Sequence, residues 1–326
     1  MSEIYVVGGH VRQNLFRKLE EWQSCDYGRI ARIDTEEKVA KGGVEYVSPP
    51  EAVAEDEPAI LFKSGYMDGS TLYACTSTEV LIYELPEFRR TGYISLPCFN
   101  DLHHVCPTIR GTLAVVSTGL DLVVEISKSG EIVQEWNVLG QDPWTRFSRD
   151  IDYRKVLTTK PHASHPNHVF ELNGELWVTR FKQKDAICLT RPGPRIDVAV
   201  EKPHDGYLFG DSVYFTTIDG HVVVASQKTL QVTKIYDLNQ MHPEPRLPLG
   251  WCRGLLPVDE RYLWVGFSRL RATKFVENVN WIKNGAPRLK ASHVALYDLQ
   301  KNECVDEIAT EPHGVGVIFS LFAAGK

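Results

Sequence analysis

Four short runs rich in β-forming residues follow one another between residues 203 and 238. They read PHDGYLF, SVYFTT, HVVVAS and QVTKIYDL, and Gly210-Asp211 and Asp219-Gly220 lie between them as turns. The same four-run pattern starts again near residues 60, 102, 165 and 252. A four-stranded unit that recurs every 40 to 60 residues or so is typical of a β-propeller blade.

The two ends of the chain hold the pieces of one more unit. The run HGVGVIFSL begins at His313, and the runs EIYVVG, GRIARID and GGVEYVS lie in the first 50 residues. Residues 312–322 would supply the innermost strand of a sixth blade, and residues 1–50 the other three. Such a join closes the ring and leaves no open sheet edge. We therefore predict an all-β fold, a six-bladed β-propeller that forms a single domain over residues 1–326.

The long connections are predicted to lie on one face of the disc. Residues 9–27 and 268–292 are insertions between the second and third strands of a blade, and residues 138–161 and 237–250 are insertions between blades. Both kinds of connection leave from the same face. Elaborated loops on a rigid scaffold are where binding residues concentrate.

The first residues of the innermost strands should ring the channel at that face, and they are unusually polar. They are Asp101, His103, His104, His162, His165, His168, His204, Asp205, Cys252, Arg253 and His313, with Ser64-Gly65-Tyr66 in the first blade. Neutral imidazole is a common ligand of first-row metals. We predict a divalent metal ion held by one histidine from each of four blades: His104, His168, His204 and His313.

The same ring allows two other interpretations. Without a metal, His103, His165, Asp101 and Asp205 would act as general acids and bases while Arg253 holds an anionic group. Alternatively, the polar residues only line the channel and hydrogen-bond through water. Strand alternation does not decide which of His103 and His104, or of His165 and His168, faces the channel.

Basic residues are expected to form a rim that binds substrate. Arg180 and Lys182 follow the second strand of the third blade, and Arg269 and Arg271 follow that of the fifth. Together with Tyr66 they are the predicted substrate-binding residues, and an acidic small molecule would suit them. Solvated loop charges are the alternative.

Net charge and composition limit the classes of binding partner and the cellular location that we expect. The net charge of −6 argues against a general nucleic-acid binder. No apolar run is long enough to cross a membrane, and the first residues lack the pattern of a signal peptide. With seven cysteines and no C-x-x-C spacing, reduced thiols and a cytoplasmic location are expected.

One late segment resembles a known group of proteins. Arg253-Gly254-Leu255, Val265-Gly266-Phe267-Ser268, Arg269 and Arg271 are similar to a segment of a poorly characterised bacterial and cyanobacterial propeller family. His103, His165 and His204 also fall where that family has histidine, and the likeness covers roughly residues 60 to 275. It implies a propeller and no settled activity. The architecture is also similar to six-bladed lactonase and strictosidine-synthase-like enzymes, whose metal ligands are oxygens and not imidazoles.

These observations predict a metal-dependent enzyme that acts on a small, anionic metabolite by hydrolysis, elimination or isomerisation. The alternative is a non-catalytic propeller that binds a ligand or a partner protein.

Overall fold

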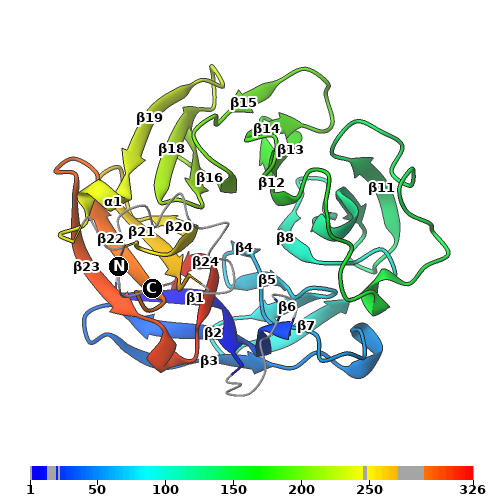
Figure 1. Ribbon diagram of the computed structural model, residues 1–326, viewed down its shortest axis with the longest axis horizontal. Coiled ribbons are helices and arrows are strands. Elements are labelled where there is room, and N and C mark those ends of the chain that lie inside the picture. Colours follow the sequence, from blue (N-terminus) through cyan, green and yellow to red (C-terminus); the bar gives the residue numbers. More distant parts are fainter. Residues whose placement is uncertain (1, 13–19, 21–22, 245–247, 271–289, 326) are drawn as a thin grey trace.

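Six separate four-stranded antiparallel sheets make up the protein. The computed structural model describes residues 2–12, 20, 23–244, 248–270 and 290–325. In it the sheets stand around a central axis, and their innermost strands face one another (Figure 1). The predicted all-β, six-bladed propeller is therefore confirmed.

Each blade follows the chain from its innermost to its outermost strand. Blade one has β4 (Gly65–Asp68), β5 (Thr71–Cys75), β6 (Val80–Glu84) and β7 (Arg89–Ile94). Blade two has β8 (Leu102–Pro107), β9 (Leu113–Ser117), β10 (Leu122–Ile126) and β11 (Ile132–Asn137). Blade three has β12 (Pro166–Leu172), β13 (Glu175–Arg180), β14 (Asp185–Cys188) and β15 (Arg195–Asp197). Blade four has β16 (Pro203–Phe209), β17 (Ser212–Thr217), β18 (His221–Ser226) and β19 (Val232–Asp237). Blade five has β20 (Trp251–Pro257), β21 (Tyr262–Ser268), β22 (His293–Asp298) and β23 (Glu303–Ala309).

Blade six joins the two ends of the chain. Its order is β24 (Val317–Ala323), β1 (Glu3–Val11), β2 (Cys25–Asp34) and β3 (Val39–Tyr46). β24 pairs with β1 in antiparallel register from Ile4 opposite Ala323 to Gly9 opposite Val317. The innermost strand begins later than the sequence suggested, because His313 ends a short 3-10 helix, Glu311–His313, and lies outside the strand.

The middle strands are apolar along their whole length because both of their faces are covered. Every residue of β9 and β10 is buried, whereas only one residue of the outermost strand β11 is. Each middle strand packs against a neighbouring blade on either side, and six apolar clusters fill the six spaces between blades. Burial of this apolar surface between blades is the main force that holds the ring together.

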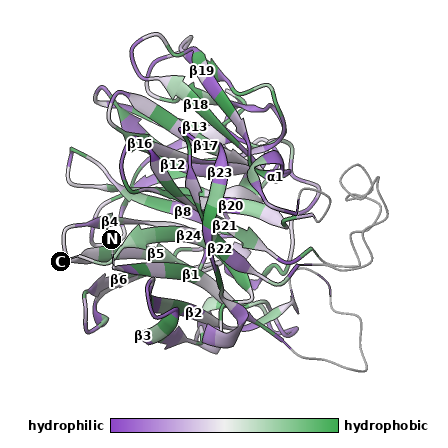
Figure 2. Cartoon of the chain, turned by 90° about the vertical axis from the view of Figure 1, so that its left-hand side faces the viewer, coloured by the Kyte–Doolittle hydropathy of each residue, from purple (hydrophilic) through white to green (hydrophobic). Residues whose placement is uncertain are grey.

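Two of the inserted connections carry short helices. The connection before blade three holds a 3-10 helix at Tyr153–Lys155, and the one before blade five holds α1 (Leu238–Met241). α1 and the C-terminus lie on opposite faces of the disc (Figure 2). Within the described residues no helix is long and apolar enough to cross a bilayer.

The other two insertions lie only in part within the described residues. β1 extends to Val11 and β2 begins at Cys25, so the connection there spans 12–24 and not 9–27. Between β21 and β22, residues 271–289 are outside the description, and so is the predicted substrate-binding residue Arg271.

Candidate functional site

A β-bulge occurs near the start of the innermost strand in five blades. In blade two it lies between Leu102 and His104, and in blade three between Pro166 and His168. Blades four, five and six have the same irregularity. A bulge puts two residues opposite one and re-aims the side chains beside it. The polar residues at these strand starts therefore do not simply alternate between channel and blade.

A pocket of about 100 Å³ lies at the face from which the blade-to-blade connections leave. Asp101, Lys63, Arg253, Phe319 and His162 line it from the ring. Its outer walls come from the segment that enters blade one and from the connection before blade three; they include Val53, Ala54, Pro58, Ala59, Arg154, Val156, Leu157, Thr158, Thr159 and Lys160. We call this cavity the mouth pocket.

Asp101 is the carboxylate of the mouth pocket. It stands directly before β8 in a left-handed backbone conformation with φ of 51°. Its Oδ1 accepts a short hydrogen bond from the buried ammonium of Lys63. Burial alone would raise the pKa of Asp101, but the charges of Lys63, His162 and His165 lower it to about 2. Asp101 is therefore an anion at neutral pH.

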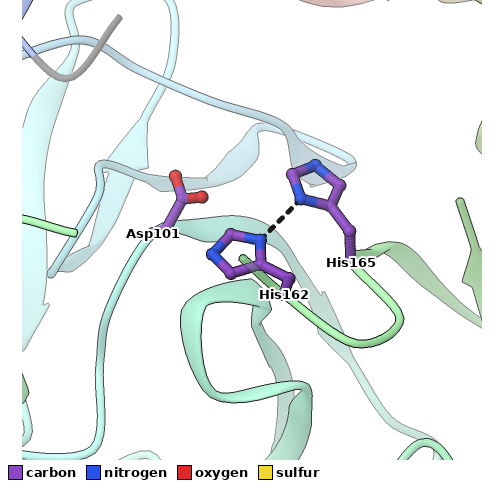
Figure 3. Close-up of side chains that lie close together, drawn as sticks. All are labelled: Asp101, His162 and His165. Atoms are coloured by element: carbon purple, nitrogen blue, oxygen red, sulfur yellow. Dashed lines mark hydrogen bonds between the residues drawn. The ribbon is translucent and has the colours of Figure 1, made fainter. Parts of the chain in front are cut away.

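Beside Asp101, two imidazoles lie against each other. Nδ1 of His162 is 2.7 Å from Nδ1 of His165, and the rings stack with their centroids 5.0 Å apart (Figure 3). Ligand atoms of Asp101, His162 and His165 all lie within 4.8 Å of one another. Burial lowers the pKa of His162, against the opposing charges of Asp101 and Asp121. Neutral imidazoles of this kind can bind a metal ion or transfer a proton.

A buried carboxylate, Asp121, fixes the loop that carries both imidazoles. Its oxygens accept backbone N–H bonds from Ala163, Ser164 and His165 at 2.7, 2.9 and 2.8 Å. Arg146 adds an ion pair to Asp121 at 2.8 Å. Lys182 donates to the carbonyl oxygen of His162. A loop held at this many points keeps its side chains in one geometry, which is what a binding or catalytic site requires.

Side chains from five blades form a closed circuit of ring contacts behind the mouth pocket, which we call the ring belt. In order around the channel its members are His103, His165, Phe181, His204, Trp251, Arg253 and Phe319. Phe319 lies between opposite sides of the ring, with the Arg253 guanidinium 4.1 Å and the His103 centroid 6.0 Å from its own centroid. Part of the predicted convergence of distant imidazoles is therefore observed.

The structure does not bring the four predicted metal ligands together. Among the described residues, the His, Cys, Asp and Glu groups close enough to share an ion do not include His104, His168, His204 or His313. His104 donates from Nε2 to the Gly65 carbonyl oxygen at 2.9 Å and accepts from the Val169 N–H at 3.4 Å. Both nitrogens are thus occupied, and no lone pair of His104 remains for a metal.

The other three predicted ligands lie apart from one another. His168 stacks on His104 with centroids 3.6 Å apart, inside the channel. His204 belongs to the ring belt, and its buried Nε2 has no hydrogen-bond partner among the described residues. The backbone oxygen of His313 accepts from Arg29 of β2, the third strand of blade six, which places it away from the innermost strand.

The residues predicted for acid–base chemistry separate into two groups. Asp101 and Arg253 line the mouth pocket, and His165 lies beside Asp101. His103 is buried behind them and donates from Nδ1 to the Asp101 carbonyl oxygen at 2.8 Å. Asp205 lines a different cavity, farther along the channel, so it does not share a site with Asp101.

Most of the predicted basic rim is engaged elsewhere. Arg180 makes a two-pronged ion pair with the buried carboxylate of Asp185, at 2.8 and 2.6 Å. Arg269 makes the same kind of pair with Glu311 at 2.8 and 2.6 Å. Lys182 is used to hold the His162 loop. Tyr66 lines the deeper cavity and not the mouth.

Sequence reasoning missed Lys63 and Phe319 and gave His162 no chemical role. Lys63 stands at the end of the apolar run ILFK, two residues before β4, and a lysine inside such a run was the available signal. Phe319 lies in β24 among apolar residues, and nothing in the sequence distinguishes it from a core residue.

A second group of ligand types, His242, Cys304 and Glu307, lies at the outer side of blade five. Lys290 donates to Glu307 Oε1, and the same oxygen lies 3.2 Å from the His242 Nε2. His242 also accepts the Glu244 N–H at its Nδ1, at 3.0 Å, so its proton belongs on Nε2. This arrangement is that of an ion-paired lysine and not of a metal site.

Comparison with known proteins supports the fold alone. No protein-family profile and no curated protein sequence matches the chain. A protein of unknown function from Bacteroides caccae is similar over 98% of both chains, with a TM-score of 0.61 and 13% identity. A chain in a nidogen/laminin complex is similar over 98% of this chain and 97% of its own, with a TM-score of 0.56 and 10% identity. A streptogramin B lyase matches over 86% of this chain and 76% of its own, with a TM-score of 0.49 and 11% identity. At such identities the first two likenesses show a shared fold, and the resemblance to a particular bacterial family stays a prediction.

Proposed function

We propose that this protein is an enzyme that acts on a small anionic metabolite in the mouth pocket. The observation that carries the proposal is the charge of the lining. Its cationic side chains are Lys63, Arg154, Lys160 and Arg253, and its carboxylate is Asp101. Even with Asp152, which pairs with Arg154 at 2.7 Å, the cations outnumber the carboxylates. A confined excess of positive charge attracts carboxylate or phosphate groups.

The His162–His165 pair would move the proton. With Nδ1 atoms 2.7 Å apart, one nitrogen must carry a hydrogen and the other must accept it. A pair that shares one proton can give it to a substrate or take one from it, and both rings are held by a rigid loop. Hydrolysis, elimination and isomerisation each need such a transfer.

The same residues are suitable donors for a divalent metal ion. Two imidazole nitrogens and one carboxylate oxygen, within 4.8 Å, suit Zn²⁺, Mn²⁺ or Fe²⁺ and leave positions open for water or substrate. Asp101 and both imidazoles would hold the ion, and Asp101 would have to share its carboxylate between the ion and Lys63. A bound ion would polarise a carbonyl group or lower the pKa of a water molecule.

Titration calorimetry with malonate tests the charge argument. We expect malonate to bind the wild-type protein, and Lys63→Met and Arg253→Met to weaken its binding at least tenfold. Lys128→Met, in an exposed turn, is the matched control and should bind like the wild type. Absence of malonate and phosphate binding to the wild-type protein would contradict the proposal.

Turnover separates an enzyme from a binding protein. A panel of small carboxylic acids and their esters should contain at least one compound that the wild-type protein converts, and His162→Gln should abolish the conversion without weakening malonate binding tenfold. Tight anion binding without any turnover across such a panel would favour the non-catalytic alternative.

A further inference from the structure

We propose that a second cavity, which opens at the opposite end of the channel, binds a small apolar molecule that carries an ammonium group. This cavity, the channel pocket, has a volume of about 230 Å³. It is lined by the later residues of the innermost strands, such as Tyr66, His168, Tyr207 and Phe322. The proposal does not depend on the function proposed for the mouth pocket.

The two pockets are separate sites. They share no lining residue among the described parts of the chain. In blades one, five and six the mouth residue comes first along the chain: Lys63 precedes Gly65, Arg253 precedes Leu255, and Phe319 precedes Phe322. The ring belt lies at the depth between them.

The walls of the channel pocket suit an apolar body. Phe170, Leu255, Leu321 and Phe322 are buried side chains of three innermost strands, β12, β20 and β24, and they line this space. Tyr66 and Leu208 are 42% and 36% exposed and stand at the rim. An apolar cavity of about 150 Å³ is enough for a benzene ring. The channel pocket therefore has room for a six-membered ring and a polar substituent.

Its charges are the reverse of those at the mouth. The lining includes the carboxylates of Asp205 and Glu171, and among the described residues it includes no lysine or arginine. Its histidines, His104 and His168, are buried. Arg253 is near Asp205, but its guanidinium lies over the Phe319 ring and lines the other pocket. A cation is the charged group that this lining would stabilise.

Asp205 has one carboxylate oxygen, Oδ1, available to pair with that cation. It is 8% exposed, and both of its side-chain hydrogen bonds, from Thr216 at 2.5 Å and from the Gly254 N–H at 3.0 Å, end on Oδ2. In the part of the chain that is described, Oδ1 accepts no hydrogen bond. The residue is also held at φ of 61°, a conformation that costs energy for a residue other than glycine.

Ser320 provides an independent sign of a missing ligand. Its side chain is 5% exposed and lines the channel pocket. Its Oγ is buried and has no hydrogen-bond partner among the described residues. Unpaired buried polar atoms are rare in folded proteins, and the ammonium of a ligand could donate to this one.

The test uses three ligands of nearly equal shape: cyclohexylamine, cyclohexanol and cyclohexanecarboxylate. Calorimetry on the full-length protein at pH 7.5 should show that the amine binds at least tenfold more tightly than the alcohol and that the carboxylate does not bind. Equal affinity for amine and alcohol, or no binding of the amine, would overturn the proposal.

Two variants and one control locate the site. Asp205→Asn should weaken the binding of the amine at least tenfold and leave the binding of the alcohol unchanged. The variant should keep its fold because an amide oxygen can still accept hydrogen bonds from Thr216 and Gly254. If that variant does not fold, Leu208→Arg at the exposed rim should also abolish amine binding. Lys63→Met should bind the amine like the wild type. Unchanged amine binding in the folded Asp205 and Leu208 variants, or a loss in Lys63→Met, would show that the ligand binds elsewhere.

Discussion

Nδ1 of His162 lies 2.7 Å from Nδ1 of His165, so the two imidazoles share a single proton in the absence of other ligands. The residues are three apart in a loop that precedes blade three, and Asp101 approaches them from blade two. His162 lines the mouth pocket, and three of the five predictions below follow from the surroundings of this contact or from the ring belt.

Removal of both imidazoles should remove any bound metal. We expect protein purified without a histidine tag to contain close to one equivalent of Zn²⁺, Mn²⁺ or Fe²⁺ by inductively coupled plasma mass spectrometry, and the His162→Ala, His165→Ala variant to contain little. His313→Ala is the control and should keep the metal. Equal metal content in all three proteins would show that these imidazoles are not the ligands.

Loss of the Asp121 carboxylate should cost stability as well as function. Asp121→Ala leaves three backbone N–H groups and Arg146 without their acceptor, and we expect the free energy of unfolding to fall by about 3 kcal/mol. Malonate binding should weaken in parallel because the His162 loop loses its anchor. Asp142→Ala, on the exposed part of the same connection, should change stability by less than about 1 kcal/mol in urea denaturation.

Amine binding in the channel pocket should decrease at low pH. Burial raises the pKa of Asp205 to about 6, against the opposing hydrogen bonds of Thr216 and Gly254 and the charge of Arg253. The carboxyl group is therefore ionised at pH 7.5 and protonated at pH 5, where its attraction for an ammonium group is lost.

The two histidines that line the same pocket do not titrate in that interval. Burial lowers the pKa of His104 to about 3 and that of His168 well below its usual value, and Arg253 stays charged. Cyclohexylamine should thus bind at least fivefold more weakly at pH 5 than at pH 7.5 in calorimetry, while cyclohexanol should change little. A pH dependence that persists in Asp205→Asn would assign the effect to another group.

The pair of His221 and Asp219 should stabilise the protein at acidic pH. The hydrogen bond that His221 Nδ1 donates to Asp219, at 3.0 Å, raises the pKa of His221 above its unfolded value of about 6.5. Its contribution is therefore complete below about pH 6.5 and is lost as the pH rises through the raised folded value. Urea denaturation should show His221→Gln less stable than the wild type at pH 5.5 and equal to it at pH 9, whereas Thr229→Ala in the nearby turn should show no such trend.

Truncation of Phe319 should connect the two pockets. Phe319→Ala removes a buried ring that contacts Lys63, His103 and Arg253, and we expect it to cost about 3 kcal/mol of stability. Malonate should then strengthen the binding of cyclohexylamine, because the opposite charges of the two ligands are no longer screened from each other. Phe209→Ala, at the last residue of β16 and outside the lining of both pockets, is the control. Independent binding of the two ligands in Phe319→Ala would mean that other side chains keep the pockets apart.

The fold could be predicted because each blade repeats the same local signals. Runs such as HVVVAS and LAVVS are buried on both faces, and turns such as Asn173-Gly174 take the left-handed conformations that a two-residue hairpin needs, with φ of 54° and 75°. These signals depend only on neighbours in sequence. The start of β24 was misplaced because the segment at His313 has strand-like composition but folds as a 3-10 turn.

The site was predicted less well, for two physical reasons. The bulges at the innermost strands break the period of two, so alternation could not tell that His104 faces Gly65 while His103 contacts Phe319. Partners of charged residues also come from distant segments. Arg269 is neutralised by Glu311, and Asp101 is paired with Lys63, and neither pairing leaves a trace in local sequence.

The ring belt lies between the mouth pocket and the channel pocket and separates them, so each pocket has a single opening. A molecule that enters either pocket has to leave through the same opening. Substrate and product at the mouth pocket would therefore compete for that opening. The lining residues of the two pockets can also diverge independently in evolution, since a substitution in one lining does not alter the lining of the other.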